Sequence, residues 1–199
     1  MPEALTLGFD TSAAHCAAAL LSGEQLIALR VEDMNKGQAE RLMPLIEDLL
    51  AEAGITWRDL SLIGVGTGPG NFTGIRIAVA AARGLSLSLN IPAIGIGTPE
   101  ALAFGLPRPC RIIIPGKRDT VIWQDFTDIP SEPQQSPLDA LPPGPPEATP
   151  QISIAEGIAR LARARARARA GTPQPRPAPI YLRPADAAPA RDRGPVILP

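Results

Sequence analysis

Hydrophobic and polar positions in the first hundred residues follow two periods in turn. Short apolar runs bounded by polar residues or glycine are typical of strands, and apolar residues spaced three and four apart are typical of helices. These patterns predict strands at residues 4–9, 14–21, 25–32, 62–66 and 92–96, and helices at 38–53, 73–89 and 99–104. Their order predicts an α/β fold in which helices flank a mixed sheet.

The two longer predicted helices differ in how their apolar residues are distributed. Helix 38–53 has one apolar face and an acidic remainder, and Gly54 follows it as a left-handed cap would. Helix 73–89 is apolar or small nearly all round, with Arg76 and Arg83 as its charged residues. Such a helix is covered on two sides, either by the rest of the monomer or by a partner protein.

After residue 105 the pattern weakens, because 19 of the 24 prolines follow residue 104. Residues 111–114 and 121–126 can pair as a hairpin through Pro115-Gly116-Lys117-Arg118-Asp119. Residues 129–150 are so proline-rich that we expect neither helix nor strand there. Residues 154–170 form a helix capped by Ser153 with Glu156 three positions on. We therefore expect two units, residues 1–104 and a looser second unit at 105–199.

The net charge of −1 conceals an asymmetry between these halves: residues 1–104 carry 6 basic and 11 acidic residues, and residues 105–199 carry 13 and 9. Any nucleic-acid contact should therefore be local and lie in the second half. Arginine occupies every second position from Arg163 to Arg169, and because a helix turns about 100° per residue these side chains spread over two faces. We interpret this segment as a solvated helix, with RNA contact as the alternative.

A cytoplasmic protein is expected, because Pro2 and Glu3 stand where a secretory leader would carry basic residues. The longest uncharged stretch, residues 84–99, is interrupted by Pro92 and by glycines, so we expect no association with a membrane. The two cysteines, Cys16 and Cys110, form no CxxC pair and are expected to be small buried residues.

Two segments could bind phosphate. Asp10-Thr11-Ser12 links two predicted strands, and the glycine-rich run from Gly66 to Arg76 links a strand to a helix. Glycines let a backbone approach closely, and the first amides of a helix favour anions. The candidate nucleotide-binding residues are Asp10, Thr11, Ser12, Gly68, Gly70 and Thr73. The alternatives are an ordinary Asx turn and a structural strand-to-helix turn.

Four segments together resemble the TsaB (YeaZ) family: Asp10-Thr11-Ser12, Gln38-Ala39-Glu40-Arg41, the run from Gly68 to Arg76, and Pro179-Ile180-Tyr181-Leu182-Arg183-Pro184. The resemblance is close over residues 4 to about 104 and patchy beyond. It implies an actin-like ATPase superfamily fold (ASKHA, ribonuclease H-like) with a reduced second lobe. It also implies a non-catalytic subunit that pairs with the TsaD enzyme, joined by the TsaE ATPase, in making threonylcarbamoyladenosine beside the anticodon of tRNA. ATP and a metal ion are then expected on the partner subunits, with no cofactor on this chain.

By the same resemblance, helices 38–53 and 73–89 form the surface that docks TsaD. The candidate partner-binding residues are Glu40, Arg41, Leu45, Arg76, Val79, Ala80 and Arg83. The alternative for the arginines Arg76 and Arg83 is an internal ion pair with Glu40 or Glu47. These helices could also join two copies of the chain when the partner is absent. We expect the tail Ile180-Tyr181-Leu182-Arg183 to pack back on the body.

No catalytic residue and no metal site are expected. Thr98 and Leu102 stand where the related catalytic subunit carries two metal-binding histidines, and Thr98 instead suits a helix N-cap before Pro99. Pro115 stands where an acidic residue is often found. The enzyme alternatives are an ATP-binding phosphotransferase of the actin and sugar-kinase class and a peptidase using Ser12 and His15. The phosphotransferase lacks a second phosphate turn, and the peptidase pair would point to opposite faces of a strand unless both residues lie in the turn.

Overall fold

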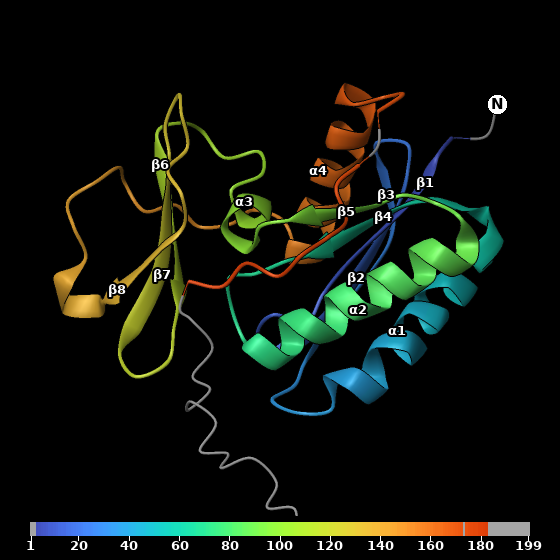
Figure 1. Ribbon diagram of the computed structural model, residues 1–199, viewed down its shortest axis with the longest axis horizontal. Coiled ribbons are helices and arrows are strands. Elements are labelled where there is room, and N and C mark those ends of the chain that lie inside the picture. The colour runs from blue at the N-terminus through green and yellow to red at the C-terminus, as the bar shows by residue number, and fades with distance from the viewer. Residues whose placement is uncertain (1–2, 173, 183–199) are drawn as a thin grey trace, which may run out of the picture.

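The computed structural model describes residues 3–172 and 174–182 (Figure 1). The strands of the first half are β1 (Leu5–Asp10), β2 (His15–Ser22), β3 (Gln25–Asp33), β4 (Leu60–Gly66) and β5 (Ala93–Ile96). Its helices are α1 (Gln38–Glu52), α2 (Phe72–Leu89) and α3 (Thr98–Leu102), with a short 3-10 turn at Trp57–Asp59. The elements predicted from the hydrophobic pattern are confirmed, and their ends differ by two residues or fewer.

These strands form one mixed sheet in the order β3-β2-β1-β4-β5. Strands β1, β2 and β3 are antiparallel neighbours, whereas β4 lies parallel to β1 and to β5. Helices α1 and α2 lie side by side on one face of the sheet, and α4 (Ile154–Ala168) lies on the other (Figure 1). The predicted fold class is confirmed as an α/β fold in which helices flank a mixed sheet.

Helix α4 corrects the prediction for the arginine-rich segment. We expected a solvated helix in the second unit, but α4 packs across the first sheet through Ala155, Ile158 and Ala162, which are fully buried. A Cβ atom at Gly8 would lie 2.5 Å from the Ala155 carbonyl oxygen, so only glycine admits this approach. The small side chains of the α4 alanines let the helix lie close to the strands. The chain therefore returns to its first lobe after residue 150.

The second lobe is a small sheet in the order β6-β7-β8 (Figure 1). Its strands are β6 (Cys110–Pro115), β7 (Thr120–Phe126) and β8 (Gln134–Pro137), followed by a 3-10 turn at Leu138–Ala140. The predicted β6–β7 hairpin is confirmed. Strand β8 corrects the expectation that residues 129–150 hold no strand: it is a short edge strand with its proline at the end, where a missing N–H breaks no pairing.

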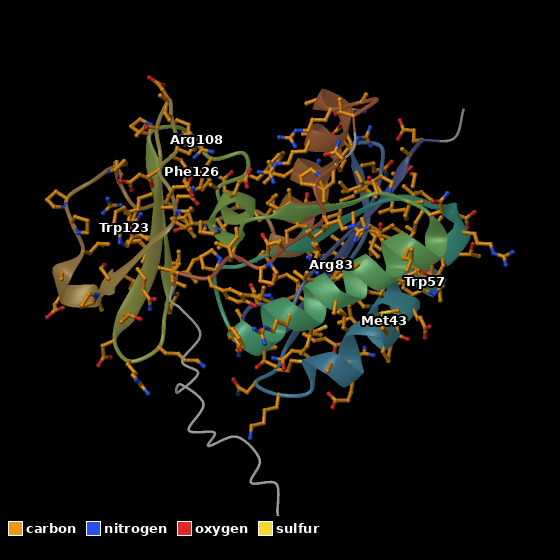
Figure 2. The ribbon with its side chains drawn as sticks, in the orientation of Figure 1. Met43, Trp57, Arg83, Arg108, Trp123 and Phe126 are labelled. Carbon is orange, nitrogen blue, oxygen red and sulfur yellow. The ribbon has the colours of Figure 1, made fainter. Side chains whose placement is uncertain are left out.

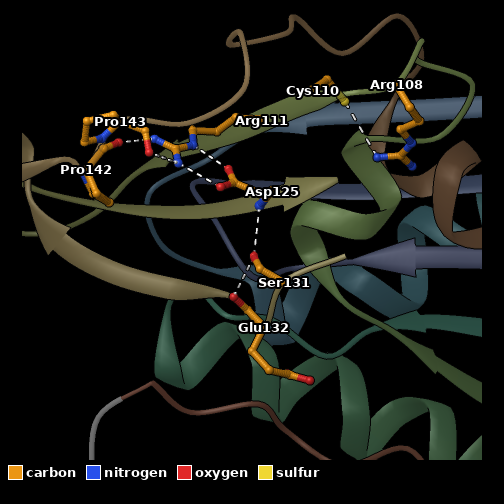
Figure 3. Close-up of polar contacts among 8 residues, drawn as sticks. All are labelled: Arg108, Cys110, Arg111, Asp125, Ser131, Glu132, Pro142 and Pro143. Carbon is orange, nitrogen blue, oxygen red and sulfur yellow. Dashed lines mark hydrogen bonds and ion pairs between the residues drawn. The ribbon is translucent and has the colours of Figure 1, made fainter. Parts of the chain in front are cut away.

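Arg111 holds the proline-rich segment against this small sheet (Figure 3). Its side chain is 4% exposed, donates from Nη2 to Asp125 at 2.8 Å, and donates from Nη1 to the Pro142 carbonyl at 2.6 Å. The guanidinium also lies 4.5 Å from the centre of the Trp123 ring. A single buried arginine thus supplies contacts that proline residues, lacking N–H donors, cannot make among themselves.

Candidate functional site

The glycine-rich loop after β4 lies directly against the turn between β1 and β2. The Asn71 amide donates to the Ser12 carbonyl at 2.6 Å, and the Thr11 hydroxyl donates to the Gly74 carbonyl at 2.7 Å. A Cβ at Gly70 would lie 2.4 Å from the Ser12 carbonyl oxygen, and one at Gly74 would lie 1.8 Å from the Thr11 carbonyl oxygen. The glycines therefore allow this backbone contact. The contact uses the Asn71 amide and the Thr11 hydroxyl, which could otherwise bind a phosphate.

The buried carboxylate of Asp10 holds the same turn together through hydrogen bonds. Its Oδ2 accepts from the Ser12 amide and hydroxyl, both at 2.8 Å, and lies 2.7 Å from His15 Nε2. The amide contact confirms the Asx-turn interpretation. Asp10 and Thr11 are fully buried and Ser12 is 2% exposed. Of the other nucleotide-binding candidates Gly68 is buried, whereas Gly70 and Thr73 are exposed. Ser12 and Gly70 line the cleft described below, and Asp10, Thr11, Gly68 and Thr73 are not part of its lining.

The order of these contacts does not suit the peptidase alternative. In a serine hydrolase the histidine stands between the nucleophile and the carboxylate, so that it can take the hydroxyl proton. Here Asp10 Oδ2 stands between Ser12 and His15, and both side chains point at it. The His15 side chain therefore faces the Asp10 carboxylate and is not placed to activate Ser12.

Thr98 also differs from its prediction. The N-cap of α3 is Gly97, with Pro99 near the helix start as expected, and the Thr98 hydroxyl instead lies 3.3 Å from the Ser12 hydroxyl. Thr98 is 3% exposed, and this buried contact links α3 to the β1–β2 turn. Within residues 3–172 and 174–182 no group of three or more histidine, cysteine or acidic side chains is placed to hold a metal ion.

An open cleft of about 980 Å³ lies between the two lobes, beside the glycine loop. Its walls come from that loop, the β6–β7 turn, and the tail residues Ile180, Tyr181 and Leu182. Three basic residues line it, Arg76, Lys117 and Arg118, and the described lining includes no acidic residue. Electrostatics therefore favours an anion in this cleft. No local pattern in the sequence marks Lys117, Arg118, Phe72 or Tyr181 as site residues, because the fold brings them together from distant segments.

The tail packs on the first lobe as predicted for residues 180–182, and Arg183 lies outside the described residues. The Ile180 amide donates to the Thr67 carbonyl at 2.8 Å. Arg76 donates from Nε to the Tyr181 hydroxyl at 2.8 Å and stacks 3.7 Å above the Phe72 ring centre. Arg83 donates to the Pro177 carbonyl at 2.8 Å. The two arginines thus hold the tail, and the alternative given for them, an internal ion pair with Glu40 or Glu47, is not formed.

Helices α1 and α2 present a joint outer surface, on which Figure 2 shows Met43 of α1 and Arg83 of α2. Leu45 and Val79 are corrections to the candidate list, since their side chains are 0% and 3% exposed and pack inside. Arg41 hydrogen-bonds Glu32 at 2.6 Å, which holds the pKa of that carboxyl below its usual value, and also pairs with Asp48. Glu40, Ala80, Arg76 and Arg83 remain exposed, together with Gly84 and Leu87, which the sequence analysis did not assign.

Leu87 is the most exposed large apolar residue among those that the structure describes, at 86%. With Ala80 and Gly84 it forms a small and uncharged strip along α2, which we call the α2 strip. Within the described residues α2 is also the helix long and apolar enough to span a membrane by length and composition. Its inner side, including Ile75, packs on the sheet, whereas the α2 strip is open to a partner.

Comparisons with known proteins agree with this fold. The family model described as "TsaD: tRNA N6-adenosine threonylcarbamoyltransferase" matches residues 32–139. The tRNA threonylcarbamoyladenosine biosynthesis protein TsaB of Buchnera aphidicola (subsp. Schizaphis graminum) is 40% identical over 99 residues, which are 50% of this chain and 47% of the relative. The Escherichia coli protein of the same name is 30% identical over 125 residues, covering 60% and 54%.

Among solved structures, YeaZ from Pseudomonas aeruginosa superposes with a TM-score of 0.74 over 90% of this chain and 100% of that one. The two sequences are 24% identical, so this likeness establishes the fold. The chain spans about half the length of the curated relatives it matches.

Proposed function

Since this chain belongs to the TsaB (YeaZ) branch of the TsaD-like family, we propose that it is a scaffold subunit that binds and activates the TsaD enzyme. The reaction served is threonylcarbamoylation of the adenosine next to the anticodon of tRNA. The TsaE ATPase joins the pair, and the partner subunits bind ATP and a metal ion. The assembled complex binds tRNA in the cytoplasm.

The α2 strip is the observation that carries this proposal. A helix that is half covered by its own sheet and otherwise small and uncharged costs little to desolvate, so it suits a closely packed protein interface. Ala80 and Gly84 let a partner helix approach, and Leu87 offers an apolar anchor. Arg76 and Arg83 border the strip and are held in place by the tail, which suits contacts that orient a partner.

A non-catalytic role fits the turn around Asp10. The Asp10 carboxylate could hold a metal ion beside a phosphate, but its Oδ2 already accepts a hydrogen bond from the Ser12 amide and contacts His15 Nε2. The glycine loop packs against the same turn. Phosphoryl transfer usually relies on a carboxylate that is free to hold a metal ion, whereas Oδ2 of Asp10 is used inside this turn. The chain is therefore proposed to act on the conformation of TsaD and to catalyse no reaction itself.

The first test is co-purification of the full chain with TsaD of the same organism, followed by a threonylcarbamoyl-transfer assay on tRNA with each component omitted in turn. We expect a stable pair whose activity needs this chain, while the chain alone is inert. Failure to associate, or full activity without the chain, would contradict the scaffold role.

A matched pair of variants tests the surface. Ala80→Arg places a long charged side chain in the α2 strip, whereas Ala164→Arg makes the same change at an exposed position of α4 on the opposite side of the sheet. We expect Ala80→Arg to weaken TsaD binding by about tenfold or more, since a charge buried at an interface is unpaired, and Ala164→Arg to leave it unchanged. Equal affinity of both variants would exclude this surface.

A second candidate function, an ATP-binding phosphotransferase, is favoured by one observation, the basic lining of the cleft. Equilibrium dialysis of the isolated chain with ATP, comparing wild type with Lys117→Ala/Arg118→Ala, separates the two functions. Binding that the double variant abolishes, together with turnover, would favour the phosphotransferase.

A further inference from the structure

A strained turn carries two of the three cations that line the cleft between the lobes, Lys117 and Arg118. At the tip of the β6–β7 hairpin, Arg118 and Asp119 have φ angles of 54° and 55°. Two successive residues with positive φ are typical of a hairpin turn that favours asparagine and glycine, and other side chains are strained there. Such strain is concentrated at functional sites. The hairpin therefore keeps a charged side chain beside the cleft at a cost to stability.

The three cations are available to a ligand. Arg76, Lys117 and Arg118 form no ion pair with any residue that the structure describes. Arg76 is fixed in place because its Nε donates to the Tyr181 hydroxyl at 2.8 Å. Asp119 follows Arg118 in the turn but is not part of the cleft lining. The cleft therefore presents positive charge that the described part of the chain does not neutralise.

The walls of the cleft suit a peptide better than a phosphate chain. The Asn71 amide and Oδ2 of Asp10, which could bind a phosphate or its metal ion, are used within the chain. The walls also include the apolar residues Ile114, Ile122 and Leu182. A polypeptide segment matches both features, since its carboxylates can pair with the cations and its apolar side chains can cover the walls.

The cleft is continuous with the α2 strip through Arg76. Arg76, Ala80, Gly84 and Leu87 are all exposed, and their spacing of three and four residues places them on one face of the helix. A helix rises about 1.5 Å per residue, so Leu87 and Arg76 lie about 16 Å apart along its axis. A specific interface covers about 800 Å² of each protein. A protein that covers the strip therefore reaches the mouth of the cleft.

We propose that the α2 strip and the cleft form one docking surface. The protein that packs on the strip inserts an acidic segment between the lobes and places its carboxylates on Arg76, Lys117 and Arg118. That protein is TsaD, and in this respect the site rests on the proposed function.

Zero-length cross-linking of the full chain with TsaD tests the contact directly. A carbodiimide joins an amine to a carboxylate when the two lie in contact. The chain has two lysines, Lys36 and Lys117, so Lys36→Arg leaves Lys117 as its one side-chain amine. We expect mass spectrometry to find Lys117 joined to an Asp or Glu of TsaD. Lys117→Arg keeps the positive charge and should remove that product.

Charge variants measure the contribution to affinity. Lys117→Glu/Arg118→Glu should weaken TsaD binding about tenfold, and less at high salt, because ion pairs are screened. Arg58→Glu makes the same change at an exposed residue at the opposite end of β4 and should leave binding unchanged. Arg118→Asn separates binding from folding, since asparagine tolerates the left-handed turn. We expect it to melt no lower than wild type and to bind TsaD about threefold more weakly.

Three outcomes would overturn the proposal, and they are distinguishable. If the double variant bound TsaD normally or Lys117 gave no product, while Ala80→Arg still weakened binding, the acidic segment would be excluded and the scaffold role would stand. If TsaD affinity were unchanged but the pair bound tRNA more weakly, RNA would be the occupant of the cleft. If the wild-type chain did not bind TsaD, this site and the proposed function would both fail.

Discussion

Gly74 and Gly84 lie ten residues apart in one helix and have opposite surroundings. A Cβ at Gly74 would sit 1.8 Å from the Thr11 carbonyl oxygen, whereas a Cβ at Gly84 meets nothing within 4 Å. The first glycine is required by the contact between loop and turn. The second is tolerated in a helix interior, where glycine is unfavourable relative to alanine.

Substituting alanine at each position separates these roles. Gly74→Ala should destabilise the fold by about 3 kcal/mol or more, because a backbone oxygen cannot move aside easily. Gly84→Ala should stabilise the free chain by up to about 1 kcal/mol through helix propensity. Urea denaturation of both variants measures this. Equal and small effects would mean that the loop is not packed as described.

The buried thiol of Cys16 makes the stability of the fold depend on pH. Its burial, followed by the nearby Glu32 and Asp10 carboxylates, raises the thiol pKa from 9.0 to about 11, with Arg41 acting in the opposite direction. A raised pKa of an acid means that the folded state holds the proton more tightly than the unfolded state. The contribution to stability is therefore present below pH 9 and lost as the pH rises toward 11.

We expect the free energy of unfolding of the wild type to fall faster between pH 9 and about 11 than that of Cys16→Ala, which has no thiol to ionise. Urea titrations at fixed pH values, compared with their values at pH 7, measure the difference. Parallel pH profiles for the two proteins would contradict a buried neutral thiol.

At the scale of elements, α2 is engaged on three sides. Its inner side packs on the sheet, α1 lies beside it, and the tail is bound to it through Arg76 and Arg83. Phe72, Arg76 and Tyr181 form one stacked group, with the two aromatic ring centres 5.0 Å apart. This stack fixes the tail as a wall of the cleft.

The strength of the stack can be measured at the Ile180 amide, which donates to Thr67. Tyr181→Ala removes the ring contacts and the hydroxyl acceptor, a loss of about 1–2 kcal/mol, so hydrogen exchange at Ile180 should speed up roughly tenfold. Tyr181→Phe keeps the ring and should give an intermediate rate. If Tyr181→Ala exchanged no faster than wild type, the tail would be held elsewhere.

At the scale of the whole molecule, the first lobe is assembled from two distant parts of the sequence. Helix α4 covers the sheet face formed by Ala17, Ala19, Leu62, Ile94 and Ile96, and it contributes Ile154, Ala155 and Ile158 to the same apolar cluster. Arg165 adds a hydrogen bond to the β5 edge. Without α4 that face would be exposed to water.

A fragment of residues 3–104 should therefore fail to fold cooperatively, although the sequence pattern presents it as a unit. Removing α4 uncovers an apolar sheet face, and such surfaces bind dyes and aggregate. Near-ultraviolet circular dichroism of Trp57 and a thermal scan provide the measurement. A peptide of residues 150–172 added during refolding should restore the transition, whereas a fragment that melts sharply by itself would show that the first lobe is autonomous.

The elements of the first half could be predicted because their signals are local. The apolar spacing in helix 38–52, Gly54 at its end and the Asx turn at Asp10 depend on residues only a few positions apart. Strand β8 was missed because its pairing with β7 is a tertiary contact that outweighs the low strand propensity of a proline-rich stretch.

The order and type of the elements in the first lobe follow from local sequence, because spacing and turn chemistry are properties of neighbouring residues. The closing of the first lobe by α4, the inward orientation of Leu45 and Val79, and the hold of Arg76 and Arg83 on the tail depend on tertiary packing. Each of these depends on which distant segment packs against a face, and a helix carries the same apolar pattern whatever it packs against.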